Sequence, residues 1–331
     1  MRRLVVLLLV ALGLAPGTWW RSSMAAVDDR QLVSFTPLRV PDVDLGPLRL
    51  AGAWQMRSAN EHFGSYSALA VLGDGTLLAA SDRGRMLRFS APGEGRSRVR
   101  LDFFAGREQR EKRQADLESL TRDPATGRIW AAFEATNRIE RYDAGFRNLT
   151  TAWPGAMRDW RSWFGAEAMV RLADGRFIVL AEGAAVWFGS EMPGLLFPSD
   201  PVAGATPARF AFVPPDGFRP VDLAQLPDGR VLILLRNARW TIAPTFSGKL
   251  MLADPATIRQ GRRWRAELVA NLAEPLPTDN YEGLAVSPDG DGGAVLWLIS
   301  DDNQMALQRT LLLKLAWPAN EKARGILRAP R

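Results

Sequence analysis

The stretch that decides the fold is EAMVRLADGRFIVLAE, residues 167–182, in which two apolar runs flank a central Asp-Gly pair. An Asp-Gly pair between two β-prone runs is a strong short-range signal for a β-hairpin. Both runs are short and rich in Val, Ile, Leu and Phe, which favours strands over helices. The stretch therefore predicts a β-hairpin with an acidic residue at each end.

The same pattern occurs five times along the chain. Its copies are SALAVLGDGTLLAASD (67–82), ESLTRDPATGRIWAAFE (118–134), EAMVRLADGRFIVLAE (167–182), DLAQLPDGRVLILLR (222–236) and EGLAVSPDGDGGAVLWLISD (282–301). Further strand-like runs such as MLRFS and ARFAFV lie between the copies. Repeating units of about 40 to 55 residues with four strands each are typical of a β-propeller. We therefore expect an all-β propeller, with five blades counted and a sixth blade without the pattern left open.

The two ends of the repeat region predict how the ring closes. The last unit lacks an outer strand after Trp317, and LRLAGAWQM, residues 48–56, would supply that strand from the N-terminal side. The propeller is thus expected over residues 48–317, with a lead-in segment over 26–47 and a tail over 318–331. Two packed β-sandwiches are the rival architecture, but they would not explain the regular spacing.

Residues 1–25 have the features of an export signal. Arg2 and Arg3 precede the apolar run of residues 4–14, and Ser23-Met24-Ala25 offers a small-x-small cleavage site. The run is shorter than the roughly 20 residues that a membrane span needs, so an uncleaved anchor is the less favoured alternative. We expect a secreted or periplasmic protein, monomeric, with no membrane span after removal of the signal.

The composition excludes several kinds of chemistry. The chain has no cysteine and one histidine, which rules out a disulfide framework, a thiol nucleophile, a Cys/His zinc site and an iron–sulfur cluster. Any Ser-His-Asp triad would have to use His62. The net charge is +6, but the basic residues are interleaved with acids along the whole chain, so we expect no nucleic-acid partner.

The repeat places charged residues together at one end of the propeller. The two ends of an antiparallel hairpin opposite its turn are neighbours, so the residues that flank each copy would surround one mouth of the central channel. Ser67 and Arg236 are joined there by eight carboxylates: Asp82, Glu118, Glu134, Glu167, Glu182, Asp222, Glu282 and Asp301. Such crowded acids must be protonated, paired with arginine or neutralised by a cation. Ca²⁺ is the expected cofactor because it prefers oxygen ligands, and Arg-Glu clusters without metal are the alternative.

Loops predicted to open onto this mouth add basic and polar side chains. The candidate substrate-binding residues are Arg83, Arg107, Arg236, Asn280 and Tyr281. Above an acidic, metal-filled well they would suit a small anionic ester or a sugar phosphate. A solvated surface loop is the plainer interpretation of such mixed charge, and a lone loop histidine such as His62 is more often structural than catalytic.

The stretch HFGSYSALAVLGDGTLLAASDRG, residues 62–84, resembles the opening signature of the phytase-like family, also called "esterase-like activity of phytase". That signature runs Phe-Gly-Gly-x-Ser-Gly-Leu, then a glycine turn, then Ser-Asp-Arg-Gly, and the chain departs from it at Ser65 and Ala68. The later stretches DLESL, GAEAM and NYEGLAVSPDG are similar to later blades of the family. The resemblance covers about residues 48 to 316.

The resemblance implies a phytase-like propeller, and members are named for phytase or esterase activity. True β-propeller phytases use several Ca²⁺ ions to bind phosphate. One hypothesis is therefore a Ca²⁺-dependent hydrolase of an ester or phosphate ester, with Glu134, Glu182 or His62 as the base. Its metal ligands would come from Asp82, Glu118, Glu167, Asp222, Glu282 and Asp301. The alternative is a non-catalytic exported propeller that binds a ligand or protein, with carboxylates that are structural and fully paired with arginine.

Overall fold

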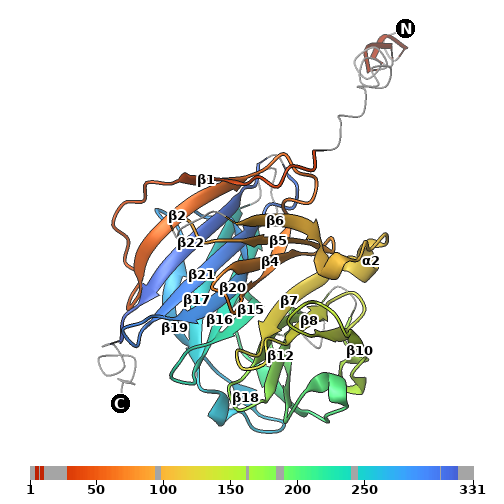
Figure 1. Ribbon diagram of the computed structural model, residues 1–331, viewed down its shortest axis with the longest axis vertical. Coiled ribbons are helices and arrows are strands. Elements are labelled where there is room, and N and C mark those ends of the chain that lie inside the picture. The colour runs from red at the N-terminus through yellow and green to blue at the C-terminus, as the bar shows by residue number, and fades with distance from the viewer. Residues whose placement is uncertain are drawn as a thin grey trace.

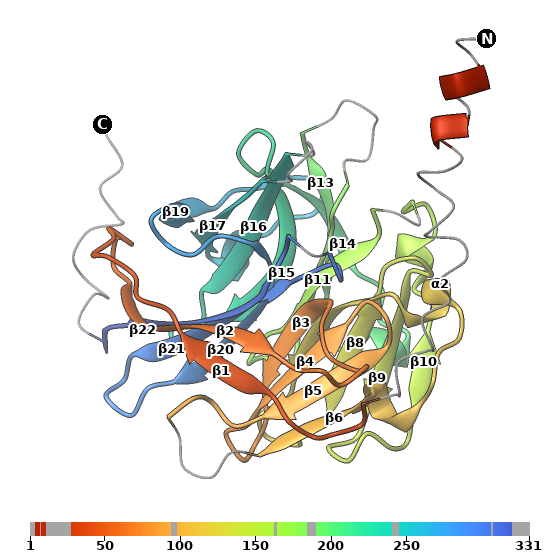
Figure 2. The ribbon, with the colours of Figure 1, turned by 90° about the horizontal axis from the view of Figure 1, so that it is seen from above.

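The computed structural model describes residues 4–6, 8–10, 28–93, 98–161, 164–183, 190–239, 245–305 and 307–319. These residues form five sheets, each made mainly of antiparallel strands and arranged around a central axis (Figures 1 and 2). We number the sheets as blades 1 to 5 in the order in which their innermost strands occur in the chain.

Blades 1 and 2 each contain four consecutive strands. Blade 1 consists of β3 (Tyr66–Val71), β4 (Leu77–Ser81), β5 (Arg85–Phe89) and β6 (Val99–Phe103). Blade 2 consists of β7 (Leu117–Arg122), β8 (Ile129–Phe133), β9 (Arg138–Tyr142) and β10 (Thr150–Ala152). The connection between the two blades contains η1 (Phe104–Gly106) and the short helix α2 (Lys112–Ala115), and η2 (Gly155–Met157) follows blade 2.

Blades 3 and 4 share a connection at their outer edges. Blade 3 consists of β11 (Ala166–Arg171), β12 (Phe177–Ala181), β13 (Met192–Phe197), β14 (Ala208–Phe212) and the short parallel strand β18 (Arg263–Trp264). Blade 4 consists of β15 (Arg219–Gln225), β16 (Val231–Arg239), β17 (Thr245–Ala253) and β19 (Glu267–Leu272). The turns η3 (Pro201–Ala203) and η4 (Pro255–Thr257) lie in the connections of these blades. Because β18 comes from the segment between β17 and β19, it ties blade 4 to the edge of blade 3.

Blade 5 closes the ring with strands from both halves of the chain. Its order is β20 (Asn280–Pro288), β21 (Ala294–Asp301), β22 (Thr310–Trp317), β2 (Arg49–Arg57) and β1 (Ser34–Pro37). The pairing of β2 with β22 confirms the closure predicted for residues 48–56. The additional strand β1 lies within residues 26–47, which the sequence indicated only as a lead-in segment. In Figure 2, β1 and β2 lie alongside β22.

The inner strands β3, β7, β11, β15 and β20 contact one another in a closed ring, and β20 contacts β3. The described residues form no sixth blade, so the fold is an all-β five-bladed propeller. Five apolar cores lie between neighbouring blades, one for each pair. Between blades 3 and 4, for example, Val170 packs in one cluster with Ile233. Burial of these apolar faces is the main contribution that holds the blades together.

The predicted turns join the two innermost strands of each blade. Gly75, Gly175 and Gly229 have φ angles of +80°, +89° and +92°, which glycine adopts without steric cost. The preceding aspartates accept hydrogen bonds from backbone N–H groups two residues later, as Asp174 does from Arg176 at 3.0 Å. The Asp-Gly pairs therefore set the hairpin turns for the reason that the sequence pattern predicts.

Residues 4–6 and 8–10 are helical and exposed, and most of the predicted export signal lies outside the described residues. Within the part of the chain that the structure describes, no helix has the length and apolar character needed to cross a bilayer. The tail predicted over 318–331 is described only at Pro318 and Ala319.

Candidate functional site

The predicted clustering of acids at one mouth follows from how the inner strands begin. Each inner strand has a β-bulge near its start, and the residue left out of the pairing is Ser67, Glu118, Glu167, Val221 or Glu282. In blades 1, 2, 3 and 5 the neighbouring strand ends beside that bulge, at Ser81, Phe133, Ala181 and Asp301. Bulges redirect a side chain out of the regular alternation and are common near active sites. One end of the channel therefore carries glutamates from blades 2, 3 and 5.

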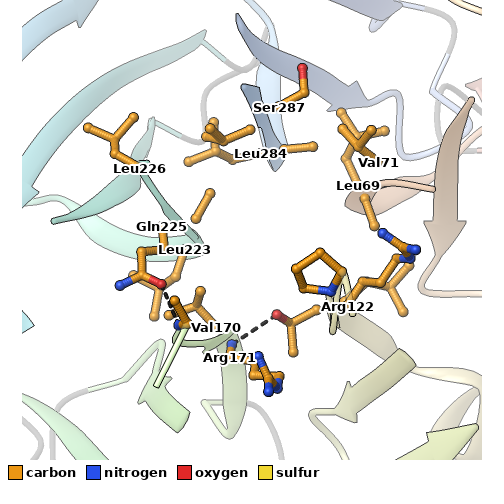
Figure 3. Close-up of a pocket in the computed structure, with 18 of the residues that line it drawn as sticks. Leu69, Val71, Arg122, Val170, Arg171, Leu223, Gln225, Leu226, Leu284 and Ser287 are labelled. Atoms are coloured by element: carbon orange, nitrogen blue, oxygen red, sulfur yellow. Dashed lines mark hydrogen bonds between the residues drawn. The ribbon is translucent and has the colours of Figure 1, made fainter. Parts of the chain in front are cut away.

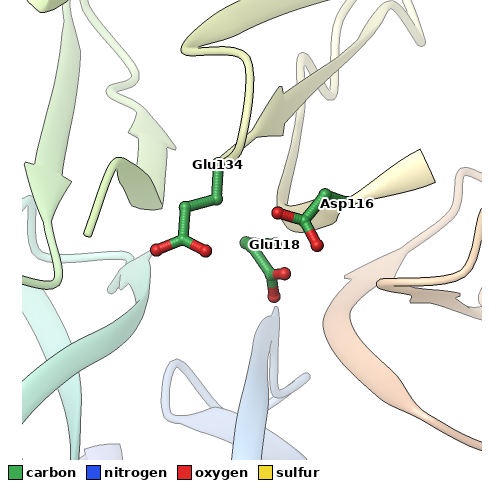
Figure 4. Close-up of side chains that lie close together, drawn as sticks. All are labelled: Asp116, Glu118 and Glu134. Atoms are coloured by element: carbon green, nitrogen blue, oxygen red, sulfur yellow. The ribbon is translucent and has the colours of Figure 1, made fainter. Parts of the chain in front are cut away.

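Two groups of three carboxylates form at this end of the channel. Asp116, Glu118 and Glu134 each place one oxygen within 4.8 Å of the others, and so do Glu134, Glu167 and Glu182. Figure 4 shows the first group, with its three side chains close together. Glu134 belongs to both groups, so it joins the acids of blade 2 to those of blade 3. We name these five residues the carboxylate cluster.

Most of the carboxylate cluster has no cationic partner among the described residues. Among the described residues, neither Glu118 nor Glu167 accepts a hydrogen bond or forms an ion pair. Asp116 accepts a hydrogen bond from the N–H of Ala135 at 3.0 Å, and Glu134 accepts one from the N–H of Gly165 at 3.2 Å. Each of these two carboxylates keeps an oxygen that is not used by the backbone.

Burial and mutual repulsion make the ionised form of the cluster costly. Burial, reinforced by Glu182 and Asp116, raises the pKa of Glu134 to about 8. Burial, together with neighbouring carboxylates, raises the pKa of Glu118 and of Glu167 well above the usual range. Burial also raises the pKa of Asp116. Without a cation, the protonated form of these side chains is therefore favoured more than in an exposed carboxyl, and Glu134 keeps its proton near neutral pH.

The donor set fits a hard divalent cation. Ligands that share one Ca²⁺ ion at about 2.4 Å lie at most about 4.8 Å apart, and both groups meet that limit. Carboxylate oxygen is the ligand type that Ca²⁺ prefers. The carboxylate cluster could therefore hold metal, and the remaining ligands of a six- to eight-coordinate ion would be water or substrate.

Arg236 neutralises the other side of the mouth. Its guanidinium donates to Glu182 Oε1 at 2.6 Å, to Asn280 Oδ1 at 3.0 Å and to Glu282. Asn280 also donates to Glu282 Oε1 at 2.9 Å. Burial, partly offset by Arg236, raises the pKa of Glu282 to about 6. Arg236 and Asn280, which the sequence predicts as substrate-binding residues, therefore already bind carboxylates of the mouth.

Asp82 and Asp301 lie farther around the same mouth. Asp82 forms an ion pair with Lys112 at 3.3 Å, from the connection between blades 1 and 2. Asp301 is buried, and burial with the nearby Glu282 and Asp82 raises its pKa well above the usual range. One oxygen of Asp301 accepts a hydrogen bond from the N–H of Asn303 at 2.6 Å. The sequence predicts Asp82, Glu282 and Asp301 as metal ligands. The structure places all three outside the two groups of carboxylates.

Asp222 occupies a different layer of the channel from the one that the sequence pattern indicates. The bulge of β15 falls at Val221. Asp222 therefore corresponds in position to Ser119 of blade 2 and not to Glu118. Asp222 is fully buried, and it accepts hydrogen bonds from the N–H of Leu284 at 2.7 Å, from its neighbour Leu223 at 2.9 Å and from Ser119 Oγ at 3.1 Å.

These bonds join blade 4 to blades 2 and 5. Because blades 2 and 4 are not neighbours in the ring, the bond between Ser119 and Asp222 crosses the channel. Ser119 also accepts a hydrogen bond from the N–H of Met169 in blade 3 at 2.9 Å. The carboxylate of Asp222 is therefore engaged in structural bonds, and the structure does not bring it into the carboxylate cluster.

A cavity of about 620 Å³ adjoins the mouth on the side of blades 3 and 4. Glu182, Arg236, Arg219, Phe164 and Phe218 are among the residues that line it. The guanidinium of Arg219 lies 3.7 Å from Glu182 Oε2 and stacks over the ring of Phe164 at 4.8 Å. Arg219 is 43% exposed, so it offers a positive charge to a molecule in this cavity.

The other predicted residues lie away from the cluster. His62 packs edge-on against Phe103 of the outermost strand of blade 1, at 4.6 Å between ring centres, and it lies near Glu61. Arg107 forms an ion pair with Glu140 in β9 at 3.8 Å. Arg83 is exposed in the turn after β4. The structure therefore brings none of these three residues to the carboxylate cluster.

Tyr281 belongs to the apolar core between blades 4 and 5, and its hydroxyl donates to the carbonyl of Pro277 at 2.6 Å. This hydroxyl is thus used within the fold and not at the mouth.

Two residues of the site do not follow from the repeat pattern. Asp116 lies just before β7 and outside the repeated stretch, so its place in the first group comes from the loop after α2. Arg219 lies two residues before the bulge of β15. The run of acids Asp116 and Glu118 at alternate positions was the signal in the sequence that could have pointed to the first group.

The fold and site together define a class: a five-bladed propeller with an acidic, partly unpaired cluster at one mouth of its channel. A family model described as "Phytase-like: Esterase-like activity of phytase" matches residues 61–304. The chain belongs to this phytase-like family. This confirms the resemblance seen in residues 62–84 and in the later blades. No curated protein matches the sequence.

Three solved structures have a distant likeness to this chain. The PQQ-bound aldose sugar dehydrogenase of Streptomyces coelicolor is 14% identical with a TM-score of 0.45, over 87% of this chain and 99% of that chain. The PQQ domain of pyranose dehydrogenase from Coprinopsis cinerea is 9% identical with a TM-score of 0.43, over 80% and 87%.

The hydrazine synthase of Kuenenia stuttgartiensis is 12% identical with a TM-score of 0.38. The match covers 76% of this chain and 62% of the hydrazine synthase chain. Likeness at this level supports no conclusion about the function of this chain. The fold is assigned from the sheet order described above.

Proposed function

We propose that the protein is a Ca²⁺-dependent hydrolase of an ester or phosphate ester, exported by its N-terminal segment, and that the reaction takes place at the carboxylate cluster. The observation that carries this proposal is the sharing of Glu134 between two groups of carboxylates in which every member except Glu182 has no ion pair among the described residues. A purely structural ring would be expected to pair each buried acid with an arginine or a backbone donor.

The residues of the cluster would divide the work between binding and proton transfer. Asp116 and Glu118 would hold a cation in the first group, and Glu167 and Glu182 would hold one in the second, with Glu134 shared between the two groups. Calcium, when bound, would supply the positive charge that polarises the ester and favours an attacking water. Arg236 fixes the orientation of Glu182 through the 2.6 Å hydrogen bond to Oε1, while Oε2 lies 3.7 Å from the guanidinium of Arg219.

Glu134 is the side chain best placed to move a proton. Its Oε1 is held by the N–H of Gly165, so Oε2 is the atom that would take up or release the proton. In the cation-free protein the pKa of Glu134 is about 8, so this carboxyl exchanges protons near neutral pH. The sequence-based assignment of Glu134 as a base candidate is therefore retained in the proposal. His62 is not, because it lies at the outer rim of blade 1.

The cavity beside the mouth would receive the substrate. Arg219 presents its charge to an anionic group, and Phe164 and Phe218 provide apolar surface for the rest of the molecule. Such a combination of aromatic surface with one cation suits a small anionic ester. We also propose that the protein is a monomer.

A hydrolysis panel tests the proposed activity. 4-Nitrophenyl acetate, butyrate and phosphate are incubated with the purified protein in EDTA, and then with Ca²⁺ added back. We expect hydrolysis of at least one ester only with Ca²⁺, and a loss of at least a hundredfold in Glu134→Gln. Glu108→Gln, a change at an exposed acid of the loop before α2, is the matched control and should leave the rate unchanged.

A Ca²⁺-independent rate, or equal rates for Glu134→Gln and the wild type, would contradict the proposal. If Ca²⁺ binds but no ester or phosphate ester is hydrolysed, the alternative of a non-catalytic binding propeller is favoured. The pairing of Glu182 and Glu282 with Arg236 is the observation that supports this alternative.

A further inference from the structure

The opposite end of the central channel holds a cavity of about 560 Å³ that the proposed hydrolysis does not use. Each of the five inner strands contributes at least one apolar side chain to its wall, including Leu69, Leu120, Val170, Leu223 and Leu284. Figure 3 shows these strands around the open centre of the cavity. A cavity of about 300 to 1,000 Å³ with an apolar wall and few polar groups is typical of a small-molecule site.

This cavity is separated from the carboxylate cluster. The hydrogen bond of Asp222 with Ser119 crosses the channel between the two ends, and both side chains are fully buried. A ligand at the apolar end would therefore not contact the carboxylates, and the two sites can be tested independently.

The polar groups of the cavity wall are mostly engaged in joining the blades. Thr121 Oγ1 accepts a hydrogen bond from the N–H of Arg171 at 2.9 Å. Gln225 accepts one from the N–H of Ala173 at 2.7 Å and donates to the carbonyl of Gly229 at 2.8 Å. Because these polar side chains are already hydrogen-bonded within the protein, few donors remain for a ligand.

Arg122 is the exception. It is half-buried at the end of β7, and its guanidinium has no hydrogen bond or ion pair within the described ranges of the chain. Arg171, at the same position of blade 3, binds the carbonyl of Leu172 at 3.2 Å and lies 3.5 Å from Asp123. A half-buried arginine without a partner is costly unless water or an anion pairs with it.

The guanidinium of Arg122 packs closely against the hairpin turn of blade 1. A methyl group built on Gly73 of blade 1 would lie 2.7 Å from its terminal nitrogen, and one built on Gly127 would lie 3.8 Å away. The guanidinium therefore extends from blade 2 to the hairpin turn of blade 1, between two residues that lack side chains. The acids of both turns have other cations, since Asp123 lies beside Arg171 and Asp74 binds Arg88 at 2.6 Å.

We propose that this cavity binds a small anionic amphiphile, with its carboxylate or phosphate on Arg122 and its aliphatic chain against the ring of five apolar side chains. The cavity wall selects the apolar chain, and the unpaired guanidinium selects the negative head group. A neutral alcohol of the same chain length would keep the apolar contacts and lose the ion pair.

Calorimetric titration tests this site with decanoate, decyl phosphate and 1-decanol, each below its aggregation or solubility limit. We expect decanoate or decyl phosphate to bind the wild type at least tenfold more tightly than decanol. Arg122→Gln should lose this preference and bind the three ligands alike. The matched control is Arg128→Gln, which changes an exposed arginine in the same hairpin of blade 2 that does not line the cavity.

A second variant tests the cavity itself. Val286→Trp places a large ring in the wall of the cavity and should abolish binding of all three ligands, while the melting temperature shows whether the fold survives. Glu134→Gln should bind decanoate as the wild type does, with or without Ca²⁺. The proposal is overturned if neither anion binds the wild type at 1 mM, or if Arg122→Gln keeps the full preference for the anions. Stronger binding of decyl phosphate than decanoate would assign a phosphate head group, and the reverse order a carboxylate.

Discussion

At the scale of single residues, Asp222 has the clearest structural role in the channel. Asp222→Ala would remove the acceptor of two backbone N–H groups and of Ser119 Oγ in a fully buried site. Leaving a buried donor unsatisfied costs about 1–3 kcal/mol. We expect the free energy of unfolding, measured with urea, to fall by about 2–4 kcal/mol for the affected donors together.

Glu108→Ala, at an exposed acid, is the control for this measurement and should change the free energy of unfolding by less than about 0.5 kcal/mol. An equally small effect of Asp222→Ala would mean that the hydrogen bonds across the channel do not stabilise the ring.

The residue scale also shows where sequence reasoning stops. The acids that flank the repeats come together as expected for Glu118, Glu134, Glu167 and Glu182. Asp222 does not, because the β-bulge of β15 shifts the register by one residue and a bulge leaves no mark in the pattern of apolar residues. The ion pairs of Arg107 and the packing of His62 depend on contacts between distant strands, which the repeat does not encode.

At the scale of the elements, the contact between β20 and β3 closes the ring and is sensitive to added volume. A methyl group on Gly283 would lie 2.7 Å from Ile299 Cγ2 and 3.0 Å from the carbonyl carbon of Ala68. The backbone of β3 has no room to yield because it packs in the ring, so Gly283→Ala should lower the free energy of unfolding by about 1–3 kcal/mol. Thermal and urea unfolding measure this change.

Gly290→Ala is the control, because a methyl group there would meet no atom within 4 Å. If both variants unfold at the same urea concentration, the close approach of blades 5 and 1 is not as tight as the structure indicates.

The elements themselves were largely predictable. Asp-Gly turns between β-prone runs fix the five inner hairpins, and residues 48–56 close the ring as the missing strand of the last unit indicates. The outer strand β1 and the addition of β18 to blade 3 were not predictable, since they are short segments whose pairing depends on the edges that neighbouring blades leave open.

At the scale of the whole molecule, the pH dependence of stability should reflect the acidic mouth. The folded-state pKa is raised for Glu134 (to about 8) and Glu282 (to about 6), above about 4.5 in the unfolded chain. The unfolded chain therefore releases these protons first, and stability is lost as pH rises through this range. Carboxylates with lowered pKa, such as Asp74 at about 2, act in the opposite direction but only below about pH 4.

In EDTA, the melting temperature should therefore fall between pH 5 and pH 8, and Glu134→Gln should show a smaller fall. Differential scanning calorimetry across this range measures the effect. A melting temperature that stays constant or rises from pH 5 to 8 would show that the mouth is neutralised by groups other than protons.

The central claim is that the carboxylate cluster holds a divalent cation, and calorimetric titration of the metal-free protein with Ca²⁺ at pH 7.5 tests it most directly. We expect saturable binding that releases protons, because the carboxyls must ionise to act as ligands. An ion present at 100 times its dissociation constant should also stabilise the fold by about 2.7 kcal/mol. Glu134→Gln should weaken binding at least tenfold, and Glu108→Gln should not. No binding heat and no rise in melting temperature with Ca²⁺ in the wild type would contradict the claim.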